Sequence, residues 1–317
     1  MLVVAGLAPD LDYASYFVGA SAFLRFHRSV LHSMIGLAVT AAAVASLFCL
    51  LDRRMPKKKI TQTAIAQPLG FGSALAICAI GVAGHALLDL FSGTGVQLLW
   101  PFHTHWYGWD VATNFDPWVL TLLVAGLLLP LLFKLVNEEV TSGKKKRSGG
   151  TAAIVTLLLL AGYFGFRVHM RVRAVDLLLS REYHGRVALS GEAFPEPLTP
   201  FEWRGVAVTD NTIEEADVPL GAGEDFDPNS SVTRYKPEDS PQLELAEKSA
   251  AAARFLEYAR LPIASVRRIE GDYRVEVRDA RFPENDDEPA DIFLRIEVAD
   301  NLQIRSEQFL FASSPNP

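Results

Sequence analysis

The sequence predicts an α-helical multi-span membrane domain followed by an α+β soluble domain made mostly of antiparallel strands. Residues 1–175 contain 15 Lys/Arg against 8 Asp/Glu, whereas residues 176–317 contain 15 against 29, so the net charges are +7 and −14. Four apolar runs in the first half are long enough to cross a bilayer, which takes about 20 helical residues. In the second half apolar and polar residues alternate, as in half-buried strands. We therefore place a membrane domain at 1–175 and a soluble domain at 176–317.

The four predicted spans cover residues 34–51, 70–91, 117–136 and 151–170. The third has a strong start signal, because Asp116 can cap the helix and Pro117 suits its first position. The opening stretch MLVVAGLA is too short to cross a bilayer. It is typical of the last two turns of a helix, so we expect that the beginning of this first helix is absent from the chain.

Two basic clusters predict the orientation of the spans, DRRMPKKK (52–59) and KKKR (144–147). Short basic loops stay in the cytoplasm, and two predicted spans separate these two clusters. Residues 9–33, residues 92–116 and everything after residue 171 then face outward, so the soluble domain is predicted to be extracytoplasmic. Arg167, Arg171 and Arg173 fall near the outer end of the last span, where such side chains can reach lipid headgroups.

The soluble domain is expected to begin with a proline-rich linker, EAFPEPLTP (192–200). Four stretches have the two-residue period of strands, namely 203–210, 273–282, 291–300 and 302–311. Residues 244–260 are rich in strong helix formers and predict one helix. ADNLQ, between the last two strands, predicts a hairpin turn. Only two cysteines occur, both in apolar runs, which excludes a disulfide framework and a cysteine-based zinc site.

Polar residues gather at the predicted outer ends of the spans. His85 and Asp89 lie four apart near the end of a span, so they share one helix face and can bind one metal ion. Asp89 could instead orient His85 through a buried hydrogen bond. Ionisable residues in a membrane helix are costly and indicate function. His103 and His105 form a further pair, but their aromatic-rich loop is also typical of a membrane interface.

Asp10 and Asp12 lie two apart after Pro9. In an extended or turn conformation both carboxylates could approach one cation, although capping and solvation of a loop would also explain them. His27 and His32 are five apart and converge only if His27 precedes the helix and His32 lies in its first turn. Ser29 is the expected N-cap of that helix.

The ordered segments PDLD (9–12), HRSVLHS (27–33) and GHALLDLFSGTGVQLLWPF (84–102) resemble the YdjM-type inner-membrane family, described as membrane-bound metal-dependent hydrolases. The family pattern runs PDxD, HRGxTHS and HxxxDxxTxxG followed by Pro-Phe, and the resemblance covers about residues 1–135. The tail is similar to the extension of longer members. The family is more distantly similar to zinc-dependent phospholipase C and nuclease P1, which hydrolyse phosphoesters with clustered metals. The resemblance also implies a location in the bacterial inner membrane.

The resemblance implies metal roles for six residues: Asp10, Asp12, His27, His32, His85 and Asp89. Ser29 and Leu31 replace the glycine and threonine of the family's second segment, and Ser92 keeps the hydroxyl of its third. Family members usually carry a Thr-His pair on a helix before PDxD, and this chain has none. The loss of that helix would remove a ligand.

These residues predict metal-assisted hydrolysis of a phosphoester in a lipid or envelope substrate at the outer face. Zinc is the expected metal because histidine is abundant, with manganese next. Arg28 is the expected catalytic residue, stabilising charge on the phosphate, although it could instead anchor to a headgroup. The bilayer is the expected partner, and no nucleic acid is expected.

Two other functions stay open. The chain could be a non-enzymatic membrane protein with a structural metal or polar cluster and a partner-binding soluble domain. A transporter is less favoured, because the polar residues lie at span ends rather than near the midplane.

Overall fold

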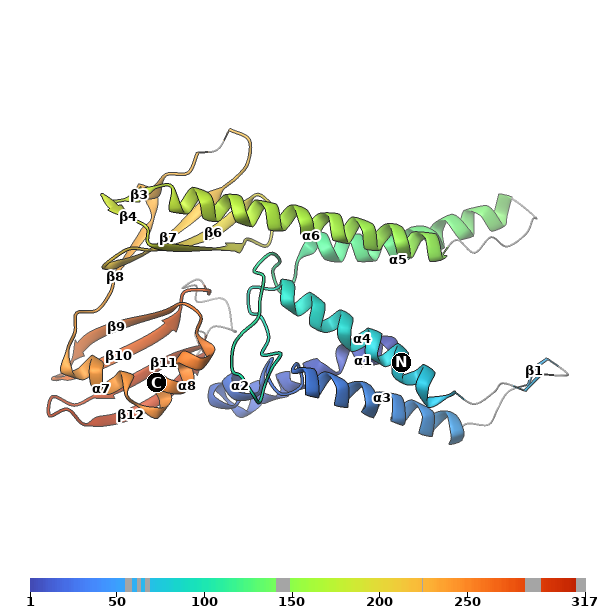
Figure 1. Cartoon of the computed structure of the whole chain (residues 1–317), viewed down its shortest axis with the longest axis horizontal. Helices are drawn as coiled ribbons and strands as arrows, with labels where there is room; N and C mark the ends of the chain where they lie inside the picture. Colours follow the sequence, from blue (N-terminus) through green and yellow to red (C-terminus); the bar gives the residue numbers. More distant parts are fainter. Residues whose placement is uncertain are drawn as a thin grey trace. The chain divides into compact units, whose positions relative to one another are not determined.

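The computed structural model describes residues 1–54, 59–61, 64–65, 69–140, 149–223, 225–282 and 292–311. The chain forms two compact units, each assembled from separate stretches of sequence. Unit 1 comprises Met1–Leu90, Thr94–Gly108 and Lys236–Pro317, and unit 2 comprises Phe91–Gly93 and Trp109–Tyr235. Helical elements fill the N-terminal part and antiparallel sheets the C-terminal part, which confirms the predicted fold class (Figure 1).

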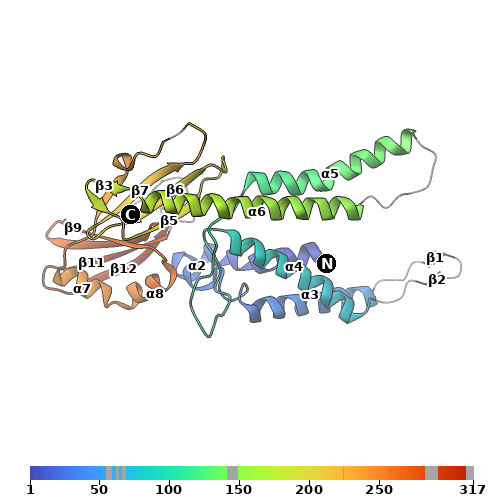
Figure 2. The ribbon, with the colours of Figure 1, turned by 45° about the horizontal axis from the view of Figure 1, so that its top comes forward.

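The helices of unit 1 are α1 (Leu2–Leu7), the 3-10 helix η1 (Pro9–Val18), α2 (Ala20–Phe26), α3 (Met34–Arg54) and α4 (Phe71–Phe91). α1, α3 and α4 pack side by side through small buried residues such as Ala45, Ala74 and Cys78 (Figures 1 and 2). Such residues let membrane helices approach closely. At Gly81 the approach is so close that a Cβ atom would lie 2.6 Å from the carbonyl oxygen of Leu2.

Among the residues that the structure describes, three helices are long and apolar enough to cross a membrane: Met34–Arg54, Phe71–Phe91 and Gly150–Leu179. They confirm the first, second and fourth predicted spans. The third predicted span lies in α5 (Pro117–Val140), and Asp116 caps it as expected, accepting the backbone N–H groups of Trp118 and Val119. Its apolar part is described only over Pro117–Leu132, so a fourth crossing stays a prediction.

A four-stranded antiparallel sheet completes unit 1, in the order β12-β11-β10-β9. Its strands are β9 (Pro262–Ile269), β10 (Asp272–Asp279), β11 (Ile292–Val298) and β12 (Ile304–Phe311). The last three confirm predicted strands, and the hairpin between β11 and β12 is closed by a hydrogen bond from Ala299 N–H to the Gln303 carbonyl. Two helices, α7 (Pro241–Glu247) and α8 (Ala250–Tyr258), pack against this sheet. A single helix was expected there, but the Ser249 hydroxyl caps a new helix by accepting Ala252 N–H.

Unit 2 contains α5, the long helix α6 (Gly149–Leu179) and a second antiparallel sheet in the order β5-β6-β7-β8. Its strands are β5 (Ser190–Pro195), β6 (Glu202–Val208), β7 (Thr212–Pro219) and β8 (Val232–Tyr235), with the short pair β3 (Glu182–Tyr183) and β4 (Arg186–Val187) and the turn η2 (Pro228–Ser230) nearby in sequence. β6 confirms a predicted strand. The predicted linker at 192–200 is half wrong, because β5 takes its first four residues and pairs with β6.

The arginines at the end of α6 bind protein groups. Arg167 is fully buried, lies 4.4 Å above the ring of Trp203 and donates its Nε–H to the Val111 carbonyl. Arg171 pairs with Asp110 and Glu192. For these two arginines the expected contact with lipid headgroups is therefore wrong, since both guanidinium groups contact residues of unit 2, an aromatic ring for Arg167 and carboxylates for Arg171.

The predicted orientation rests on basic clusters that fall largely outside the described residues. The cluster at 144–147 lies wholly outside them, and of the cluster at 52–59 only Asp52, Arg53, Arg54 and the backbone of Lys59 are described. Lys59–Thr61 and Ala64–Ile65 form the short strands β1 and β2. The orientation and the boundary at residues 175–176 stay predictions.

Candidate metal centre

PDLD begins η1, directly after α1. Of the two expected conformations, extended or turn, the extended one is not found, because residues 9–18 form consecutive turns of a 3-10 helix. Successive residues of a 3-10 helix are about 120° apart, so two residues with one between them project in different directions. The carboxylate side chain of Asp10 is accordingly half exposed, at 51%, whereas that of Asp12 is buried, at 3%. The two carboxylates therefore face different neighbours.

HRSVLHS forms the turn between α2 and α3. Arg28 has a φ of 55°, in the left-handed region, and this turns its backbone N–H toward the Asp12 carboxylate at 2.9 Å. The Ser29 hydroxyl donates back to the last carbonyls of α2. The expected N-cap role of Ser29 is wrong, since α3 begins at Met34 and the Ser33 hydroxyl accepts the N–H of Gly36.

The third segment behaves as predicted. His85 and Asp89 lie on one face of α4, with His85 Nε2 at 3.1 Å from Asp89 Oδ2. Asp89 is buried and His85 is 13% exposed at its side chain. Both residues stand in the last two turns of the helix, next to the segment that carries His32.

Four side-chain donors meet between these three segments, and we call them the four-donor cluster: Asp10, His32, His85 and Asp89. His32 Nε2 lies 3.0 Å from His85 Nε2, 3.4 Å from Asp89 Oδ2 and 3.7 Å from Asp10 Oδ1. His85 Nε2 lies 3.5 Å from the same Asp10 oxygen and 3.1 Å from the same Asp89 oxygen. All five contacts are thus made by the same four atoms, one from each residue.

These separations are in the range expected between ligands of one metal ion. Zinc binds imidazole nitrogen and carboxylate oxygen at about 2.0–2.1 Å, which places tetrahedral ligand atoms roughly 3.3 Å apart. Five of the six separations within the four-donor cluster, all except the one between Asp10 and Asp89, run from 3.0 to 3.7 Å. Within the described residues, ligand atoms of Asp10, His32 and His85 all lie within 4.8 Å of one another. The donor set, two imidazoles and two carboxylates, is one that zinc accepts and that manganese also tolerates. The residues present therefore fit a divalent cation.

Asp12 and His27 lie behind the cluster. Asp12 Oδ2 is 2.9 Å from His32 Nδ1, the ring nitrogen that faces away from the cluster, and Asp12 Oδ1 is 3.1 Å from His27 Nδ1. A carboxylate on the far nitrogen of a ligating histidine fixes the ring and raises its basicity. Of the six predicted ligands the structure thus brings four together, and it places Asp12 as the partner of one of them.

The charges of these groups depend on one another. Burial raises the pKa of the Asp12 carboxyl, but hydrogen bonds with His27 and His32 outweigh burial and hold that pKa well below its usual range. Burial lowers the pKa of His32, yet its bonds to Asp10 and Asp12 raise it to about 9. For His27 burial prevails and lowers the pKa. The carboxylates around His32 thus create a site that favours positive charge.

Arg28 borders the cluster. Its Nη2 lies 3.4 Å from Asp89 Oδ1, and its Nη1 lies 3.5 Å from the carbonyl oxygen of Gly95. The guanidinium is 11% exposed. The predicted catalytic arginine is therefore next to the donors, held by one of them.

Sequence reasoning missed the aromatic residues around His27. The Phe23 ring stacks on the His27 ring at 4.2 Å, and the Tyr13 ring meets it edge-on at 5.4 Å. The only signal was the spacing of Phe23, four residues before His27 on a helical stretch. By contrast, His103 and His105 are exposed and stand outside the four-donor cluster.

All three segments lie within a region of the chain that a known family matches. The YdjM inner membrane protein family matches residues 1–174, more than half of the chain and the whole region that supplies the four-donor cluster. No curated protein and no solved structure matches the chain. With its three apolar helices, the chain is an inner membrane protein and belongs to the YdjM family.

Proposed function

We propose that this protein is a membrane-bound, metal-dependent hydrolase that cleaves a phosphoester of a lipid or envelope substrate. The observation that carries the proposal is the meeting of two histidine nitrogens, 3.0 Å apart, with one oxygen each of Asp10 and Asp89 at 3.1–3.7 Å from both nitrogens. His32, His85 and Asp89 are buried or nearly so, whereas Asp10 is half exposed. The solvent side of the cluster is therefore the side of Asp10, from which a substrate would approach.

Each residue has a distinct task in this proposal. His32, His85 and Asp89 would hold the ion, and Asp10 would complete the set or yield its position to water or substrate. A divalent cation bound there supplies Lewis acidity, since it lowers the pKa of water and polarises a phosphoryl oxygen. Asp12 orients His32 through its far nitrogen. Arg28 presents a guanidinium beside the donors, where it can bind a phosphoryl oxygen.

A structural metal site is the second candidate, and one observation favours it. Structural zinc sites use four protein ligands, whereas catalytic sites keep one position open. In the cluster Asp10 and Asp89 each lie within 3.7 Å of the Nε2 atoms of both histidines, so four protein side chains are available as ligands. The two functions differ in what they require of the exposed Asp10, because only a hydrolase needs Asp10 to leave its ligand position free for water or substrate.

The test begins with metal content of the purified full-length chain in detergent, measured by mass spectrometry. We expect about one divalent ion per chain, zinc before manganese, and its loss in His85→Ala. His103→Ala is the matched control, since His103 is exposed and outside the cluster. Absence of metal from the wild type, together with equal thermal stability of wild type and His85→Ala, would overturn the metal proposal.

The second stage measures hydrolysis of bis-p-nitrophenyl phosphate and of phospholipids by the metal-loaded protein. We expect cleavage that needs His85 and persists in His103→Ala. Bound metal without cleavage of any phosphoester would favour the structural site. Asp10→Asn separates the two functions further. If Asp10 gives up its position to water or substrate during catalysis, Asp10→Asn should keep the bound metal but change the rate of hydrolysis.

A further inference from the structure

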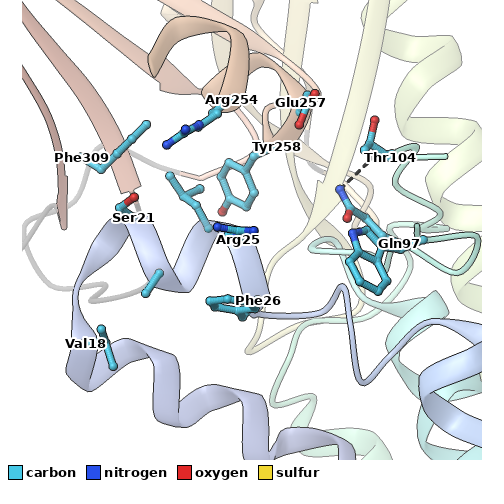
Figure 3. A pocket seen from close by; sticks show the side chains of 13 residues that line it. Val18, Ser21, Arg25, Phe26, Gln97, Thr104, Arg254, Glu257, Tyr258 and Phe309 are labelled. Carbon is cyan, nitrogen blue, oxygen red and sulfur yellow. Dashed lines mark hydrogen bonds between the residues drawn. The ribbon is translucent and has the colours of Figure 1, made fainter. Parts of the chain in front are cut away.

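A cavity of about 660 Å³ lies within unit 1, apart from the four-donor cluster. One wall is α2 with the end of η1, a second is the loop from Gln97 to Thr104, and the third is formed by α8 and β12 (Figure 3). Its volume is in the range of pockets that hold a small organic ligand. The cavity therefore has the size of a binding site.

The cavity is positively charged. Arg25 at the end of α2 and Arg254 on α8 both line it, and among the described lining residues Glu257 is the one with a carboxylate. The guanidinium of Arg25 lies 5.4 Å from the centre of the Phe26 ring, and no ion pair of Arg25 or Arg254 with a carboxylate is found among the described residues. Two guanidinium groups from separate elements are a common means of binding a phosphate or carboxylate.

The rest of the wall is largely apolar and aromatic. Phe26, Trp100 and Phe309 line the cavity together with Tyr258. The Gln97 side chain holds the loop in place by donating to the Thr104 carbonyl at 3.0 Å (Figure 3). A simple inorganic anion would leave this apolar surface in contact with water. An amphiphile, with an anionic head and an apolar tail, would cover both parts of the wall.

The cavity is connected to the candidate metal centre by direct contacts. Arg25 and Phe26 immediately precede His27 and Arg28 in the chain, and the Gln97 N–H donates to the Arg28 carbonyl at 3.0 Å. The lining segments also adjoin the apolar spans, since α2 leads toward α3 and the loop follows α4. A ligand in the cavity would thus contact the same segment that carries His32.

We propose that this cavity binds an anionic amphiphile of the phospholipid class, with Arg25 and Arg254 on the phosphate and the aromatic wall on the apolar part. Its further role as the recognition site for the substrate of the metal centre rests on the proposed function. Binding itself does not depend on metal or on catalysis.

Native mass spectrometry of the full-length chain in an uncharged detergent tests this proposal. The probes are dihexanoyl phosphatidylglycerol, dihexanoyl phosphatidylcholine and inorganic phosphate. We expect the phosphatidylglycerol to bind more tightly than both others. Arg25→Gln and Arg254→Gln should each weaken its binding about tenfold, the effect of one charge-assisted hydrogen bond at a partly solvated site. Arg267→Gln is the matched control, an exposed arginine of β9 away from the cavity.

Three results would overturn the proposal: equal binding of the two lipids, equal binding of inorganic phosphate, or wild-type binding by both cavity variants. Thermal unfolding of each variant verifies its fold, and both substituted arginines are exposed. Metal content is measured on the same samples. A chain without metal whose lipid binding still needs Arg25 would refute the hydrolase and support the cavity. Metal-dependent hydrolysis that is unchanged in both cavity variants would support the hydrolase and refute the role of the cavity in recognising its substrate.

Discussion

Asp12 offers the sharpest test of how the four-donor cluster is held. Its carboxylate is buried and is contacted by His32 Nδ1 at 2.9 Å, His27 Nδ1 at 3.1 Å and the Arg28 N–H at 2.9 Å. Asp12→Asn preserves size but removes the charge that fixes the His32 ring. Loss of such a partner weakens metal affinity by about 10–100-fold, or about 1.4–2.7 kcal/mol. We expect this loss in the dissociation constant for zinc, measured by competition with a chromophoric chelator.

A second buried aspartate gives the matched control. Asp116 accepts three hydrogen bonds, from Trp118 N–H, Val119 N–H and the Tyr163 hydroxyl, but lies in unit 2. Asp116→Asn should lower the unfolding temperature without changing zinc affinity. Equal zinc affinity of Asp12→Asn and wild type would refute the reasoning. So would an equal loss in Asp116→Asn, because the effect would then be general destabilisation.

Three further predictions concern the fold around and beyond the cluster. Gly36→Ala should cost about 1–3 kcal/mol and reduce metal content, because its Cβ would lie 2.0 Å from the Val30 carbonyl oxygen; Gly84→Ala, with open space around it, is the control in thermal unfolding and metal assays. Glu214 is buried, and although burial raises its pKa, hydrogen bonds from three hydroxyl groups lower the pKa below 4.5. Wild type should therefore be more stable than Glu214→Gln above pH 4.5, and this difference in unfolding free energy should shrink as the pH falls further. A difference that grows toward acid pH would contradict the prediction. Arg281→Met should cost about 3–5 kcal/mol in unfolding free energy, because it leaves a fully buried carboxylate partner uncompensated, and an unchanged unfolding temperature would count against it.

Composition and periodicity were sufficient to predict the elements whose signal is local. Apolar length located α3, α4 and α6, and the two-residue period located β6, β10, β11 and β12. The strand β7 was missed, since Glu214 and Glu215 interrupt the expected polarity pattern, and β8 and β9 were not predicted either. Glu214 is buried because Thr212, Ser231 and Thr233 satisfy its carboxylate, and those partners come together only in the folded sheet.

The grouping of sequence segments in space was beyond local reasoning. Residues 94–108 and 236–317 belong to one compact unit with the first helices. Arg281 joins them, donating to the carbonyls of Thr94 and Tyr258 while its guanidinium pairs with Asp279. Contacts between residues 187 positions apart leave no periodic trace in the sequence. The cavity lined by Arg25 and Arg254 was not predicted for the same reason, because its walls come from segments far apart in the sequence.

Asp10 and Asp12 of PDLD contact different nitrogens of His32 because of helix geometry rather than residue type. Two aspartates separated by one residue look equivalent in sequence, and an extended segment would have let both approach one cation. In the 3-10 helix η1 they diverge by about 120°, so Asp10 reaches His32 Nε2 while Asp12 reaches His32 Nδ1. One imidazole is thus contacted on both nitrogens by the same four-residue segment. Insertion or deletion of a residue between the two aspartates would break this arrangement, whereas exchange of Leu11, which is 71% exposed, would not.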